Sequence, residues 1–299
     1  MHKFVFHNDR LLPIEQVRLS PGQAGLLHGW GIFTTLRVSD GVPFAFERHW
    51  NRLTRDASRI QIPLMVDSGA LRNSVCELIA ANQIKSGCIR IYFVFNKATI
   101  WHSDESLPPV DLIIYSTDLP VRGGHTQLAV MAHGRHAANP LTGAKVTSWL
   151  NNVWHVDQAR QRGFDDVILL NERDEVAECT AANIYCVKGQ MVRTPPGSSG
   201  CLLGVTREIL LEISQNEIDL VERAFSLDDL YSADEVFITS TTRNVQAVDR
   251  IEDKSMPRAP GVVTERLARL FSQYVMDYET RARPGARTTR EDSQLVSGR

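Results

Sequence analysis

The chain has 299 residues, of which 43% are hydrophobic and 23% are charged, and its formal net charge is −2. This composition is ordinary for a soluble globular protein, and the near-neutral charge argues against nucleic acid or an anionic membrane as a partner. No apolar run approaches the roughly 20 residues of a membrane span, and the beginning of the chain predicts a strand and not a secretion signal. The five cysteines follow no metal-ligand spacing, so we expect no metal site. We expect the cysteines to be free thiols in a cytoplasmic protein.

Residues 1–117 predict a β-rich first domain with two helices. The turn Ser39-Asp40-Gly41 indicates a hairpin, and apolar residues on one face favour a helix from Glu47 to Gln61. A second helix is expected at 68–84, and a long polar loop from Asn96 to Pro109. Alternating polarity and turn residues predict the strands of this domain at 3–6, 10–13, 32–38, 43–46, 88–95 and 110–117.

Residues 118–124 combine proline with two glycines and predict a linker to a larger second domain at 125–279. Helices are expected in this domain at 147–162, ending at Gly163, at 205–215 and at 260–278. The remaining residues, 280–299, are rich in Arg, Gly, Ser and Thr, which predicts a disordered tail. The strands expected in the second domain are 126–132, 166–170, 175–179, 183–187, 190–193, 218–222, 235–240 and 245–248. The fold class is therefore α+β.

Three separate features carry chemistry. Lys145 lies in an apolar stretch, Glu178 ends a β-rich segment, and the turn Gly204-Val205-Thr206-Arg207 opens a helix. Any one of these alone is more often structural. Together they match the needs of pyridoxal 5′-phosphate (PLP): an amine for covalent attachment, an acid that keeps the pyridine nitrogen protonated, and a helix N-terminus that holds the phosphate.

The motifs around these residues form an ordered series along the chain. In the first half they are His28–Phe33 and Arg52-Leu53, and in the second half Ala144–Asn152, Gly163–Leu170, Val176–Tyr185, Thr194–Pro196, Gly204–Arg207, Ala233–Phe237 and Thr239–Thr242. Over roughly residues 5–275 this series resembles the class IV aminotransferases, the fold-type IV PLP enzymes. That group includes branched-chain and D-amino-acid aminotransferases and 4-amino-4-deoxychorismate lyases. The resemblance implies a smaller N-terminal α/β domain and a larger, β-barrel-like C-terminal domain.

The resemblance also implies a role for each matched residue. Lys145 looks like the lysine that forms the Schiff base and moves the proton, and Glu178 like the partner of the pyridine nitrogen. Leu202 resembles the residue that packs on the ring face, with a core leucine as the alternative. Asn183 and Arg207 are expected to support the site structurally. The implied cofactor-binding residues are Lys145, Glu178, Arg52, Leu202, Val205, Thr206 and Thr241, of which the last three and Arg52 would hold the phosphate.

Features that separate the family's members are mixed in this chain. The segment Phe33-Thr34-Thr35 is similar to that of the lyases, whereas Arg37 and Arg90 fall where branched-chain enzymes carry arginines. The D-amino-acid enzymes' Arg-x-His pair is only half present, as Arg90-Ile91-Tyr92, and Trp149 stands where many transaminases place a tyrosine. The candidate substrate-binding residues are Arg37, Arg90, Thr35, His28, Trp30 and Thr242; a structural role is the alternative for each, above all for Trp30 and His28.

The leading expectation is a PLP-dependent aminotransferase that moves an amino group between a branched-chain-like or D-amino acid and a 2-keto acid. The alternative is 4-amino-4-deoxychorismate lyase, which gives 4-aminobenzoate and pyruvate, and Thr35 favours it because a hydroxyl can assist elimination. A non-catalytic PLP-binding protein would be expected to have lost Lys145 or Glu178, and both are present. The resemblance implies a homodimer, in which the 97–109 loop is either a lid or an element of the partner's pocket.

Overall fold

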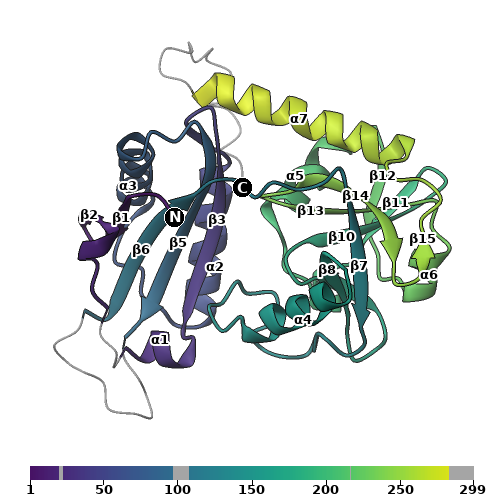
Figure 1. Ribbon diagram of the computed structural model, residues 1–299, viewed down its shortest axis with the longest axis horizontal. Coiled ribbons are helices and arrows are strands. Elements are labelled where there is room, and N and C mark those ends of the chain that lie inside the picture. Colours follow the sequence, from purple (N-terminus) through teal and green to yellow (C-terminus); the bar gives the residue numbers. More distant parts are fainter. Residues whose placement is uncertain (20–22, 97–107, 216, 283–299) are drawn as a thin grey trace, which may run out of the picture.

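Two β-sheets organise the chain (Figure 1). The computed structural model describes residues 1–19, 23–96, 108–215 and 217–282. Most of the predicted 96–109 loop and most of the predicted tail lie outside these residues. Sheet membership changes between residues 117 and 125, where the linker was predicted, although folding of the two parts as separate domains stays a prediction.

The first sheet is antiparallel and has the strand order β2-β1-β6-β5-β3-β4. One of its faces packs against two amphipathic helices, α2 and α3, through a core that includes Leu36, Leu53, Leu78 and Ile91. The elements of this half are β1 (Phe4–His7), β2 (Arg10–Pro13), α1 (Ala24–His28), β3 (Gly31–Ser39), β4 (Val42–Pro43), α2 (Phe46–Arg59), α3 (Ser68–Ala81), β5 (Ser86–Phe95) and β6 (Val110–Thr117).

The second sheet is curled into a half-barrel with the order β12-β11-β10-β13-β14-β7-β8-β9, and β15 pairs with β14. One apolar core, with Ile184 and Val248, packs against α6, and another, with Tyr185 and Phe237, packs against α5 and α7. Its elements are β7 (His125–Met131), α4 (Leu150–Gln161), β8 (Asp166–Leu170), β9 (Val176–Cys179), β10 (Asn183–Lys188), β11 (Met191–Thr194), α5 (Val205–Ile213), β12 (Asp219–Glu222), α6 (Leu227–Tyr231), β13 (Glu235–Ser240), β14 (Asn244–Ile251), β15 (Lys254–Ser255) and α7 (Val262–Ala282).

The expected α+β class and most of the predicted elements are confirmed, but three predictions are wrong. The strand predicted at 43–46 is instead β4, Val42–Pro43, because Ala45 has a positive φ of 53° and α2 begins at Phe46. The helix predicted from 147 begins only at Leu150, since the residues before it pair with β3. The helix predicted at 260–278 spans Val262–Ala282 instead, so α7 continues past the predicted end.

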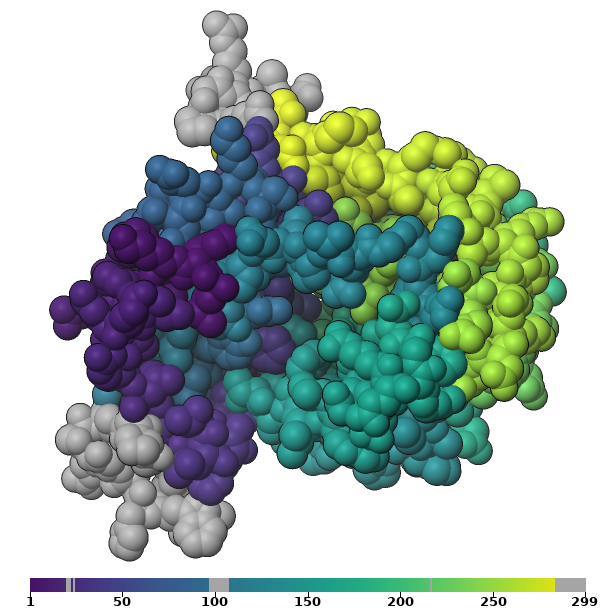
Figure 2. Space-filling view, viewed as in Figure 1, coloured from purple at the N-terminus to yellow at the C-terminus, as the bar shows by residue number. Residues whose placement is uncertain are grey.

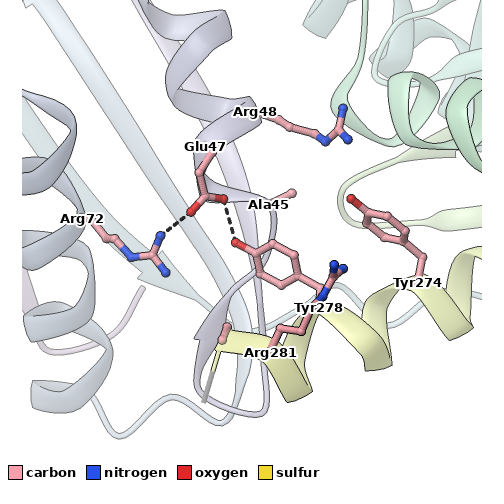
Figure 3. Close-up of a pocket in the computed structure, with 8 residues that line it drawn as sticks. Ala45, Glu47, Arg48, Arg72, Tyr274, Tyr278 and Arg281 are labelled. Carbon is pink, nitrogen blue, oxygen red and sulfur yellow. Dashed lines mark hydrogen bonds and ion pairs between the residues drawn. The ribbon is translucent and has the colours of Figure 1, made fainter. Parts of the chain in front are cut away.

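The C-terminal helix α7 joins the two halves, and Figure 1 shows it running along one side of the molecule above both of them. Phe44, next to α2, packs edge-on against Phe271 and Tyr278 of α7. Glu47 accepts hydrogen bonds from Arg72 of α3 and from the Tyr278 hydroxyl, the latter at 2.9 Å, beside a pocket of about 360 Å³ (Figure 3). Both apolar and polar contacts therefore hold the halves in one arrangement.

None of the helices in the described ranges combines the length and apolarity that crossing a membrane requires. Within the same ranges, His, Cys, Asp and Glu side chains form no group of three or more suited to a metal ion.

Candidate active site

The segment that carries Lys145 belongs to the second half of the chain but is held by the first. The amide of Phe33 on β3 donates to the Lys145 carbonyl at 3.0 Å, and the amide of Thr147 donates to the Gly31 carbonyl at 2.9 Å. The Lys145 amide donates to Oδ2 of Asp56, a buried carboxylate on α2, at 3.0 Å. Three hydrogen bonds thus position the backbone of this lysine where the two halves meet.

The environment of the Lys145 ammonium lowers its pKa to about 7. Burial is the largest cause, and the charge of Arg52 adds to it, whereas Glu178 acts in the opposite direction. The Nζ atom lies 4.4 Å from the ring centroid of Phe33 and 5.8 Å from that of Trp149. A large share of this amine is therefore neutral near pH 7, which a nucleophile or a base requires.

Glu178 is buried at the end of β9 and both of its carboxylate oxygens are engaged. Arg135 donates from Nη2 to Oε1 at 2.7 Å, and the amide of Leu202 donates to Oε2 at 2.9 Å. Burial raises the pKa of Glu178, and the charge of Arg135 opposes that rise. These contacts fix the direction of the carboxylate. Arg135, which lies in the loop after β7, was not singled out in the sequence.

Arg52 is buried on α2 and its guanidinium is only partly satisfied. Its Nη2 donates to Oγ1 of Thr34 at 2.7 Å, and that hydroxyl forms a second hydrogen bond, also of 2.7 Å, with Nδ1 of His49. Its Nε is buried without a hydrogen-bond partner in the described part of the chain. Burial lowers the pKa of Arg52 to about 10, and burial together with the charges of Arg52 and Lys145 holds the pKa of His49 well below its ordinary value. A buried cation with an unused N–H group suits an anionic ligand.

The N-terminus of α5 offers a second feature suited to an anion. No side chain caps this helix, although Val205 and Thr206 in its first turn are buried. A Cβ atom at Gly204 would lie 2.3 Å from Oδ1 of Asn183, so any larger residue where the chain enters the helix would require the Asn183 side chain to shift. First-turn amides without an intrahelical partner, together with the helix dipole, favour a phosphate.

Ion pairs connect α2, the helix that carries Arg52, to α5. Arg48, one turn before Arg52 on α2, pairs with Glu208 and Glu212 of α5. The charge of Glu208 also raises the pKa of Arg52, so the two side chains are near one another. Thr241, the remaining residue expected at the phosphate, lies in the turn between β13 and β14.

One face of the first sheet presents an aromatic row beside Lys145. Phe33 stacks on Tyr92 with centroids 5.2 Å apart, and Tyr92 stacks on Tyr115 at 5.7 Å. The Arg90 guanidinium lies 5.8 Å from the Tyr115 ring and also contributes to the lowered pKa of Lys145. Thr35 is the direct cross-strand neighbour of Arg90. This face combines an apolar wall with one cation and one hydroxyl.

The remaining candidates lie farther out or in the core. Arg37 donates to Oδ1 of Asn244 at 2.8 Å and lines a groove together with Thr242. The Trp30 indole donates to the Ile60 carbonyl at 3.2 Å and packs against the first core, which is the structural arrangement considered for it. His28 is exposed at the end of α1. Leu202 contacts Glu178 through its backbone amide.

Comparison with known proteins places the chain in a family. The family described as "Amino-transferase class IV" matches residues 31–251, which is most of the chain. The chain belongs to the class IV aminotransferases. A D-alanine aminotransferase of Bacillus licheniformis is 27% identical over 88% of this chain and 94% of its own length, and an aminodeoxychorismate lyase of Bacillus subtilis is 26% identical over 91% and 94%.

A solved structure extends this likeness to the fold. The crystal structure of a branched-chain aminotransferase from Thermoproteus uzoniensis superposes with a TM-score of 0.85 at 27% identity, covering 93% of this chain and 96% of that one. The fold-type IV architecture expected from the sequence is confirmed. PLP is the cofactor of class IV aminotransferases. Its phosphate fits the unused Nε of Arg52 and the uncapped N-terminus of α5. Its aldehyde fits the low-pKa amine of Lys145.

Proposed function

We propose that this class IV aminotransferase moves an amino group between an amino acid with an apolar side chain and a 2-keto acid, with Lys145 as its catalytic residue. The observation that carries this proposal is the lysine whose pKa is lowered to about 7 between Arg52 and Glu178. A neutral amine at that position serves first as a nucleophile and then as the group that carries a proton between two carbon atoms.

PLP bound here would supply an electron sink for the negative charge that develops on the substrate α-carbon. Glu178 would face the pyridine nitrogen, and Arg135 would keep its carboxylate in that direction. Arg52, with the amides of Val205 and Thr206 and the hydroxyl of Thr241, would hold the phosphate. The Nζ of Lys145, whose pKa is lowered to about 7 and which lies beside the Phe33 ring, would accept the α-proton of the substrate and carry it.

The aromatic row supports an apolar substrate side chain. Phe33, Tyr92 and Tyr115 offer stacked rings, so an aliphatic or aromatic side chain loses water without leaving a polar group unpaired. Arg90 beside this wall provides a counter-charge for the α-carboxylate. Its one-sided position does not by itself distinguish L- from D-amino acids, so both belong to the proposed substrate range.

The test is a set of single half-reactions. The holoenzyme is mixed with L-leucine, L-glutamate or D-alanine, and the visible band of the bound cofactor is followed. Loss of that band together with release of the matching keto acid supports the proposal and identifies the donor. Lys145→Ala should abolish the reaction and covalent cofactor attachment while circular dichroism shows an intact fold, and turnover by this variant would refute the role of Lys145.

The second candidate is 4-amino-4-deoxychorismate lyase. Thr35, opposite Arg90 on the same face, favours it because its hydroxyl lies beside the proposed carboxylate position and is suited to assisting an elimination. The products decide between the two: pyruvate and 4-aminobenzoate from aminodeoxychorismate indicate the lyase. In that case Thr35→Val should lose lyase activity and leave cofactor binding intact.

We also propose that the enzyme acts as a cytoplasmic homodimer. Leu150, Val153 and Trp154 on α4 are exposed large apolar side chains that a second copy would cover. Analytical ultracentrifugation of the full chain tests this assembly, and a monomer at micromolar concentration would refute it.

A further inference from the structure

Thr34 of β3 and His49 and Arg52 of α2 form a connected group of buried polar side chains. Thr34 alternates along β3 with Phe33 and Thr35, so its side chain lies on the opposite face of the sheet from theirs, toward α2. Figure 1 shows β3 and α2 along the side of the first half that faces the second sheet, and Figure 2 shows a hollow in the surface where the two halves meet. The group therefore lies where the first half borders the second.

The hydrogen bonds of this group determine which atom carries each proton. A guanidinium can only donate, and Nη2 of Arg52 donates to Oγ1 of Thr34 at 2.7 Å. The same Nη2 lies 3.4 Å from Nδ1 of His49, so a proton on Nδ1 would be placed beside a cation. Nδ1 is therefore unprotonated and accepts the proton of the Thr34 hydroxyl at 2.7 Å, which leaves the one proton of the neutral ring on Nε2. Burial and the charges of Arg52 and Lys145 favour this neutral form, because they lower the pKa of His49.

Arg52 is oriented by neutral acceptors and keeps its charge. Within the described ranges its hydrogen bonds go to Thr34 and to the His49 ring, and neither of them is an ion pair. The carboxylate of Asp56 on the same helix is engaged elsewhere, since Oδ1 accepts from Arg55 at 2.9 Å and Oδ2 accepts from the Lys145 amide at 3.0 Å. A carboxylate in place of Thr34 would also orient the guanidinium but would cancel its charge. A hydroxyl and a neutral imidazole fix the direction of the planar guanidinium and leave both its charge and its Nε for a ligand.

We propose that Thr34 and His49 are positioning residues for the phosphate of the cofactor, because they orient Arg52 through hydrogen bonds that leave its charge intact. The inference rests on the proposed place of Arg52 at the phosphate, and the two side chains act through Arg52 alone. Loss of the Thr34 hydroxyl or of the His49 Nδ1 acceptor would free the guanidinium to turn. Phosphate binding would then be weakened by the entropy lost in ordering this side chain.

The test compares pyridoxamine 5′-phosphate with pyridoxamine, which differ only in the phosphate and form no covalent bond with Lys145. Both are titrated by calorimetry into the full-length apoenzyme of each variant. The ratio of the two dissociation constants measures the preference for the phosphate, whereas general damage to the fold weakens both ligands alike. Thr34→Val and His49→Leu should reduce this preference about tenfold. Thr34→Ser and His49→Asn, which keep a hydroxyl and a neutral acceptor, should stay within about threefold of the wild type.

Thr54→Val is the matched control, because Thr54 is exposed on α2 and its hydroxyl donates to the Trp50 carbonyl of the same helix. This variant should keep the preference of the wild type. Arg52→Gln should lose at least as much preference as Thr34→Val. Adding Thr34→Val to Arg52→Gln should cause no further loss, because both changes remove the same contact.

Three results would overturn the inference: an unchanged preference in Thr34→Val, an equal weakening of both ligands, or additive losses in the double variant. If Arg52→Gln alone leaves the preference unchanged, the place of Arg52 at the phosphate fails and the inference fails with it. The proposed role of Lys145 stands in either case, since neither ligand reacts with its amine. Failure of the inference and failure of the proposed aminotransferase function are therefore distinguishable.

Discussion

The charge of Arg52 should hold down the pKa of Lys145 in the free protein. A lysine with the ordinary pKa of about 10.5 is neutral in about one molecule in three thousand at pH 7, whereas a pKa of about 7 makes about half of the molecules neutral. The gain in reactive amine is therefore about a thousandfold. Arg52→Gln removes the second-largest cause of this shift and leaves burial in place, so we expect the pKa of Lys145 to rise by about one unit.

The assay is competitive labelling of the apoprotein by an amine-specific reagent between pH 5 and 10, read out by peptide mass spectrometry. The exposed Lys85 in the same digest serves as an internal reference, and Arg10→Gln, a change of an exposed arginine on β2, serves as the matched control. Wild type and control should show half-maximal labelling of Lys145 near pH 7, and Arg52→Gln should require a higher pH. A wild-type Lys145 midpoint near the ordinary lysine value of 10.5, or an unchanged Lys145 midpoint in Arg52→Gln, would refute the electrostatic reasoning.

Three further predictions address the remaining parts of the site. Glu178→Gln should still bind PLP but slow exchange of the substrate α-proton about a hundredfold or more, and a near-normal exchange rate by NMR would count against Glu178. Gly204→Ala should cost about 1–3 kcal/mol in urea unfolding because its methyl group meets Asn183, whereas Gly197→Ala, with only ordinary contacts around the added carbon, should cost less. Burial lowers the folded-state pKa of His49, so its contribution to the free energy of unfolding is fully present above about pH 6.5 and is lost as the pH falls toward the folded pKa. The free energy of unfolding should change with pH by up to about 1.4 kcal/mol per pH unit in that window. His49→Gln should flatten this dependence in urea unfolding.

Much of the fold was predictable because its elements are long or strongly patterned. Helix α2 and the strands β3 and β5 show clear apolar periodicity, and the positive φ of Gly163 terminates the region of α4 as expected for a helix stop. The helices α1 and α6 were not predicted, since five residues are too few to show a helical period. Phe44 and Phe46 favoured a strand prediction, because alternating apolar residues are typical of a strand. Both side chains are buried, but the chain turns between them at Ala45.

The residues of the candidate site could be predicted only where they lie within a sequence motif. Lys145 and Glu178 were identified by their neighbours in sequence, and the structure brings their charges within mutual influence, although their roles stay predictions. Arg135 has no such neighbours. It contacts Glu178 across a long stretch of chain, and no local pattern in the sequence encodes such a contact.

The anchoring of Lys145 on β3 and α2 limits how this enzyme can move. Glu178 belongs to the second sheet, whereas the backbone of Lys145 is bonded to Phe33 and Asp56 of the first half. A hinge rotation between the halves would therefore move Lys145 away from Glu178. A chimera that takes its first half from a relative must accordingly preserve the carboxylate of Asp56, because it accepts the hydrogen bond that positions the Lys145 backbone.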